Sequence, residues 1–173
     1  DGDGYGDVQT ISLGNVTFDP TVVPNITVQR AGGTVPLNQA ANKILALGSL
    51  NNINLGLTLT NSNGYGLSVS DSFALSGTPN FSVATASNSN VVQGLYLTGA
   101  LSGTGFVKTG AGAMVLTSTG NSFTGNINIG QGVVSAGSDA VLGNSANLIQ
   151  LNPTATTATF RATGTYTLNH TIQ

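Results

Sequence analysis

Three aspartates lie close together near the start of the sequence, at Asp1, Asp3 and Asp7, and glycines separate them. A hard cation such as Ca²⁺ binds several carboxylate and carbonyl oxygens at this spacing, with glycine at the bend. No glutamate follows to complete a coordination shell, because the chain contains none. The pattern therefore leaves two interpretations open, a calcium site at Asp1, Asp3 and Asp7 or an acidic linker that binds nothing.

The other chemically active side chains are few and dispersed along the sequence. His170 is the only histidine, and a Ser-His-Asp triad would need a nucleophile and an orienting acid beside it. It lies in a strand-like alternation, so we interpret it as a surface or stacked strand residue. Asp19, Asp71 and Asp139 each lie beside turn residues, without a visible cluster of basic partners. The basic residues of the chain are Arg30, Lys43, Lys108 and Arg161, and nothing in the sequence brings them together with these aspartates. We therefore expect no enzyme activity.

Asparagine triplets of the N-glycosylation type carry little information in this chain. Asparagine, serine and threonine are so frequent that chance alone produces about four such triplets. The candidate acceptors are Asn15, Asn25, Asn80 and Asn169.

Composition excludes several classes of function. Only 6% of the 173 residues are charged and the net charge is −2, so no cationic surface is available for nucleic acid. The chain has no cysteine, which excludes disulfides, thiol nucleophiles and cysteine-based zinc sites. No apolar stretch reaches the roughly 20 residues that span a bilayer, so this segment is not expected to insert into a membrane.

Apolar residues alternate with serine, threonine or asparagine over most of the chain, as in residues 53–59, 67–69 and 127–129. A period of two indicates half-buried strands, and the glycine clusters between them indicate tight turns. Short, regularly spaced strands fit a sandwich, a barrel or a solenoid. The solvated positions carry threonine and asparagine rather than charge, and these residues form hydrogen-bonded ladders when coils stack. We therefore expect an all-β, parallel β-solenoid of about eight short coils with no large helices.

Residues 101–151 carry an ordered series of motifs. Leu101-Ser-Gly-Thr-Gly-Phe-Val-Lys-Thr-Gly110-Ala-Gly is followed by Asn121-Ser-Phe-Thr-Gly125, then by a Gly-Gln-Gly turn and by Ala140-Val-Leu-Gly143. This series resembles the autotransporter passenger-associated repeat. The resemblance implies a right-handed parallel β-helix in a secreted bacterial surface protein. The domain organisation that follows is an Asp/Gly-rich segment over residues 1–7 and one β-solenoid domain over residues 8–173, with the repeat at 101–151.

Within this repeat, alternation also predicts which side chains face the interior. We expect the bore to be filled by Val107, Val115, Ile127, Ile129 and Val133. Lys108 is the one charged residue of the repeat, and we expect its stem to lie outside, over a neighbouring coil.

The acidic segment has a resemblance of its own. Residues 1–7 are similar to the Asp-rich calcium loops of thrombospondin type 3 and integrin-type repeats, although Tyr5 stands where aspartate or asparagine is usual.

Neither end of the predicted solenoid carries a recognisable cap, and residues 165–173 have a strand-like pattern up to the last residue. Uncapped coils expose unpaired backbone groups, and a head-to-tail contact that does not close produces a filament. We therefore expect a non-enzymatic extracellular structural protein, a building block of a surface fibre that stacks on itself or on further coils of its own chain. The alternative is a segment of an autotransporter-like adhesin that binds glycans or other cells.

Overall fold

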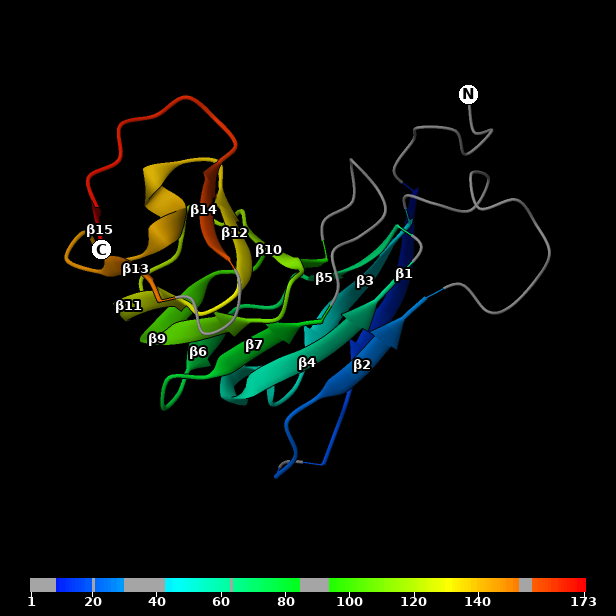
Figure 1. Ribbon diagram of the computed structural model, residues 1–173. Coiled ribbons are helices and arrows are strands. Elements are labelled where there is room, and N and C mark those ends of the chain that lie inside the picture. The colour runs from blue at the N-terminus through cyan, green and yellow to red at the C-terminus, as the bar shows by residue number, and fades with distance from the viewer. Residues whose placement is uncertain (1–8, 20, 30–42, 63, 85–93, 153–156) are drawn as a thin grey trace.

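The computed structural model describes residues 9–19, 21–29, 43–62, 64–84, 94–152 and 157–173 (Figure 1). In these residues the chain is all-β and winds as a parallel β-solenoid, which confirms the fold class expected from the alternation. Helical structure in the described ranges is limited to two short 3-10 turns, η2 (Ile53–Leu55) and η3 (Asp139–Leu142). The Asp/Gly-rich segment 1–7 lies outside the described residues.

Two parallel sheets run along the stack and contribute one strand each to successive coils (Figure 1). The first sheet consists, in spatial order, of β1 (Gln9–Val16), β3 (Lys43–Leu50), β5 (Tyr65–Val69), β8 (Leu95–Leu97), β10 (Ala113–Leu116), β12 (Gly132–Ala136) and β14 (Ala158–Ala162). The second runs from β2 (Asn25–Val28) through β4 (Gly56–Asn61), β7 (Asn80–Val83), β9 (Leu101–Thr109), β11 (Thr124–Ile129) and β13 (Leu148–Leu151) to β15 (Thr171–Ile172). The short strand β6 (Phe73–Leu75) pairs with the first part of β9.

The expected number of about eight coils is too high for the described part of the chain, in which the first sheet stacks seven strands. The expectation assumed a uniform coil of roughly 20 residues. That length holds in the middle of the chain, where Ala113 pairs with Val133. It fails where longer connections join the strands, as between Gln9 and Lys43, which are register partners on adjacent coils.

In-register pairing places like side chains above one another inside the stack. In the first sheet one interior column is apolar through every coil, and it consists of Ile11, Leu45, Leu67, Leu95, Met114, Val134 and Phe160. Along the second sheet, Phe106 packs edge-on against Phe81 of the neighbouring strand and against Phe123 just before β11, with ring centroids 5.8 and 5.7 Å apart. Such edge-to-face pairs add to the stability gained from apolar burial. The core is therefore continuous along the axis of the solenoid.

The predicted interior face is right for some residues of the repeat and wrong for others. Ile127 and Ile129 are buried in the core, as expected. Val107 and Val133 are only half-buried, and the core instead receives Phe106 and Val134. A shift of one residue exchanges the two faces of a strand. In both strands two apolar residues are adjacent in sequence, so alternation alone cannot assign the face.

Val115 is buried but is not part of the core cluster, which receives its neighbours Met114 and Leu116. Its register partners are Tyr96 and Ser135, and the three residues form a column between the two interior columns of the first sheet. The predicted interior position of Val115 is therefore wrong as well.

Two buried asparagines connect successive coils where the backbone leaves the sheets. Asn121 accepts a hydrogen bond from the Leu101 N–H at 2.8 Å and donates to the Val141 carbonyl at 2.7 Å. Asn147 accepts from the Gly125 N–H at 2.8 Å and donates to the Leu142 carbonyl at 3.0 Å. These amides satisfy backbone groups that the ladders leave unpaired, and unpaired buried groups would cost about 1–3 kcal/mol each.

Candidate functional site

The calcium site expected at the start of the chain falls outside the residues that the structure describes. Asp1, Asp3 and Asp7 all lie outside the described residues. Within the part of the chain that the structure describes, no three acidic, histidine or cysteine side chains gather in a way that could hold a metal ion. The calcium interpretation thus remains a prediction.

Lys108 lies inside the solenoid, so its expected outward position is wrong. The side chain is fully buried, and its register partners are Phe81 on one coil and Ile129 on the next. Lysine therefore occupies a position in an otherwise apolar column. The reason is the same shift of one residue in the alternation. Phe106 and Lys108 face the interior of the solenoid, and Val107 between them does not.

The ammonium group of Lys108 has three carbonyl acceptors. Nζ donates to the carbonyls of Thr109 at 2.6 Å, Gly110 at 2.8 Å and Gln131 at 3.2 Å. An ammonium group has three donors, so this set matches its capacity. Two acceptors belong to the corner of its own coil and the third to the corner of the next coil. Lys108 therefore joins two stacked corners from within.

Burial disfavours the charged form of this group and lowers the pKa of Lys108 to about 8. No carboxylate takes part in the three hydrogen bonds of the ammonium. The arrangement resembles a structural cross-link more than a reactive amine, because the nitrogen faces backbone oxygens rather than solvent.

His170 and Asp139 are brought together by the winding of the chain, although they are far apart in sequence. His170 Nδ1 lies 2.9 Å from Asp139 Oδ1, and its Nε2 donates to the Asn144 carbonyl at 3.0 Å. The histidine is only 6% exposed, so it is not a surface residue, and it lies in the bend directly before β15 rather than within a strand. The pair fastens the segment before β15 to the coil that contains η3.

The carboxylate of Asp139 is held in its ionised form. Desolvation acts to raise its pKa, but the Asn169 backbone N–H at 2.8 Å, the His170 ring and the Asn169 amide at 3.0 Å outweigh it. Together these donors lower the pKa of Asp139 to about 2. This is an aspartate–histidine pair, but the second ring nitrogen faces a backbone carbonyl where a triad would place a hydroxyl.

Of the other described aspartates and the glycosylation candidates, only Asn169 takes part in this cluster. Asp19 is exposed and accepts hydrogen bonds from the hydroxyl and the backbone N–H of Thr21, which lower its pKa. Asp71 is exposed and caps the Ser72 N–H. The four asparagines of the triplets are all exposed, although the Asn169 amide is bound to Asp139. They are Asn15, Asn25, Asn80 and Asn169.

A ladder of hydroxyl groups follows the first sheet where its strands end. The hydroxyl of Ser70 donates to the Leu47 carbonyl at 3.3 Å, and that of Thr98 donates to the Val69 carbonyl at 3.2 Å. Thr117 repeats the contact with Leu97 at 3.5 Å. Each hydroxyl therefore bonds to the coil that precedes its own.

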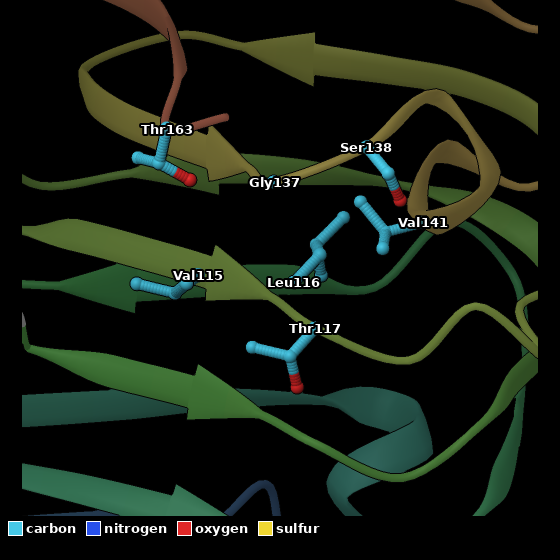
Figure 2. A pocket seen from close by; sticks show the side chains of 7 residues that line it. All are labelled: Val115, Leu116, Thr117, Gly137, Ser138, Val141 and Thr163. Carbon is cyan, nitrogen blue, oxygen red and sulfur yellow. The ribbon is translucent and has the colours of Figure 1, made fainter. Parts of the chain in front are cut away.

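Gly137 interrupts this ladder and leaves a pocket of about 200 Å³. Figure 2 shows Thr117 and Thr163 on either side of Gly137, with Leu116 beside Val141, which belongs to η3. A Cβ atom on Gly137 would have the Thr163 hydroxyl as its nearest neighbour, at an ordinary contact distance of 3.6 Å. The pocket is thus the space of one missing side chain in the hydroxyl ladder.

Comparison with known proteins does not extend this description. No family model matches the chain, and no curated protein or solved structure is significantly similar to it. Among the described residues, no helix has the length and hydropathy needed to cross a bilayer.

Lys108→Met tests the buried ammonium. The folded state binds the Lys108 proton less tightly than the unfolded chain, whose pKa is 10.5. This difference lowers the free energy of unfolding of the wild type by its full amount below pH 8, and it no longer lowers it above pH 10.5. Between these values we expect the free energy of unfolding of the wild type to rise by about 3 kcal/mol relative to Lys108→Met. Urea unfolding across this pH range measures the difference. Parallel profiles for the two proteins would contradict the buried, charged position.

Gly137→Thr tests the gap in the hydroxyl ladder. We expect this variant to be more stable by about 1 kcal/mol, because the side chain fills the pocket, reaches the preceding coil and restricts the unfolded chain. For a domain of this size the thermal midpoint should rise by about 2–4 °C, measured by calorimetry. Gly77→Thr is the matched control, since Gly77 also has open space but a φ of 65°. It should destabilise, and equal effects of both variants would contradict the explanation.

Proposed function

We propose that this chain is a non-enzymatic structural protein of an extracellular fibre, in which copies stack end to end. The observation that carries the proposal is the state of the two terminal coils. Within the described residues, the outermost strands of both sheets have one neighbour each, and apolar side chains beside them are exposed. Parallel edges of this kind are templates for pairing with another chain.

The first coil presents an apolar end surface. Ile11, which begins the interior column of the first sheet, is 46% exposed, and Leu13 in the same strand is 53% exposed. Val22 and Val23, just before β2, are exposed to a similar degree. Exposed aliphatic side chains on an end coil are available to pack against a partner.

The last coil offers the complementary end. Its strands β14 and β15 form the opposite edges of the same two sheets, and Ile172 is 46% exposed. Phe160 ends the interior column that Ile11 begins. A second copy placed head to tail would therefore extend both sheets with the same strand direction and continue the apolar column. Such a contact is heterologous and does not close, so it propagates.

Three further observations support an extracellular, non-enzymatic role. Only 6% of the residues are charged, and the described acidic residues do not converge with a nucleophile. The single aspartate–histidine pair is used to fasten a chain segment. Residues 101–151 resemble a repeat of secreted bacterial surface proteins, and they form five successive strands of the stack, β9 to β13.

Ile11→Asp tests end-to-end stacking. A charge on the terminal apolar column should prevent a second copy from docking, because burial of an unpaired carboxylate is strongly unfavourable. We expect filaments of the wild-type protein in negative-stain images and short or no filaments for the variant. The side chain is exposed in the single copy, so its fold should be retained, which circular dichroism checks.

Thr60→Asp is the control variant, because Thr60 is exposed on the side of the second sheet and not at an end. It should assemble like the wild type. Dispersed single copies of the wild type at high concentration would contradict the proposal, as would filaments of Ile11→Asp of unchanged length.

A further inference from the structure

A polar groove of about 360 Å³ lies on the outside of the solenoid, over four successive coils. Its volume falls in the range of about 300–1,000 Å³ that is typical of sites for small ligands. The groove follows the stack axis where β9 and β11 bend. Its lining consists of Thr78, Thr104, Gly105, Thr124, Gly125, Asn126, Asn128 and Gln150.

Bare backbone forms the floor of the groove. A Cβ atom on Gly105 would lie 2.2 Å from the Asn126 carbonyl, and one on Gly125 would lie 2.5 Å from the Gly105 nitrogen. Neither position can therefore carry a side chain while the coils keep their spacing. The pairing of β11 with β9 also contains an irregularity between Thr124 and Ile127, which bends the strand at this point.

The walls are oriented by hydrogen bonds between coils. The Thr78 N–H donates to the Thr104 hydroxyl at 3.4 Å. The Asn126 amide donates to Gln150 Oε1 at 3.1 Å and accepts from the Leu148 N–H at 3.2 Å. These contacts hold hydroxyl and amide groups at the exposed rim, repeated at the spacing of about 4.8 Å between paired strands.

The chemistry of the lining restricts the ligand. All lining side chains are uncharged, so a phosphate, a uronate or a basic peptide would find no counter-charge in the groove. The lining contains no aliphatic or aromatic side chain, so an apolar ligand would gain little by burial. An elongated, uncharged molecule with many hydroxyl groups can both donate to and accept from threonine, asparagine and glutamine along its length.

We propose that this groove binds an unbranched, uncharged oligosaccharide that lies along the stack axis. The site is on the side of the solenoid, so a single copy can bind the ligand without end-to-end stacking. Repeated weak hydrogen bonds, rather than an aromatic platform, provide the affinity. We expect dissociation constants in the millimolar range for a single chain and tighter binding to an assembled fibre, where the grooves of many copies act together.

Titration of the ¹⁵N-labelled protein with linear hexasaccharides of β-1,4-glucose, α-1,4-glucose and β-1,4-mannose tests the site. We expect at least one of them to shift the amide resonances of Gly105, Gly125 and the Asn128 side chain, with saturation in the millimolar range. The charged probe is a linear hexasaccharide of galacturonic acid, which should bind at least about tenfold more weakly.

Thr104→Val and Asn128→Leu keep the shape of the wall and remove its hydrogen-bonding groups. Each should weaken binding by about tenfold, whereas Thr58→Val, on the same sheet but outside the groove, should leave it unchanged. Absence of any shift with all three neutral probes would overturn the proposal. Equal binding by the groove variants would overturn the assignment of the site, and stronger binding of the galacturonic acid probe would overturn the class of ligand.

Discussion

In-register stacking of parallel coils is the constraint on which every other feature of this molecule depends. Within the inner strands of the two sheets, residues have a register partner one coil above and one coil below, so a side chain meets a similar environment repeatedly along the axis. Interior columns are apolar because a single polar member would lie between two apolar neighbours. Lys108 can be buried in such a column because three backbone carbonyls at two stacked corners accept hydrogen bonds from its ammonium group. Asn121 and Asn147 satisfy backbone groups in the same way, from one coil to the next.

The same constraint separates the two surfaces to which we assign functions. Within the described residues, the two ends carry sheet edges and exposed aliphatic residues, and the sides carry threonine, asparagine and glutamine that bond between coils. The proposed stacking and the proposed recognition of a ligand along the side would therefore use different residues. The Asp139–His170 contact joins the last described coil to the coil that contains η3 and fastens the segment that leads into β15. An aspartate and a histidine can form an acid–base pair, but here the second ring nitrogen of His170 binds the Asn144 carbonyl, so the contact holds two chain segments together.

The fold class could be predicted because a period of two with uncharged polar partners leaves few alternatives to stacked coils. The interior face could not be predicted wherever apolar residues are adjacent, as at Phe106 and Val107, because a shift of one residue preserves the pattern. The coil count depended on connection lengths, which alternation does not determine. The contact between Asp139 and His170 depends on the length of one particular coil, so nothing in the local sequence indicates it. The groove was missed because the bend that forms it is set by contacts between coils.

Disulfide formation between introduced cysteines measures the stacking most directly, since the natural chain has no cysteine to interfere. Thr58 pairs with Ser82, and Ser82 pairs with Thr109, so these residues form one column over three coils. Cysteines at positions 58 and 82, or at 82 and 109, should oxidise readily, because paired strands lie within the Cα separation of about 4.4–6.8 Å that a disulfide requires. Cysteines at 58 and 109 are two coils apart and should remain reduced. Efficient oxidation of the 58 and 109 pair, or failure of both neighbouring pairs, would contradict parallel stacking in this register.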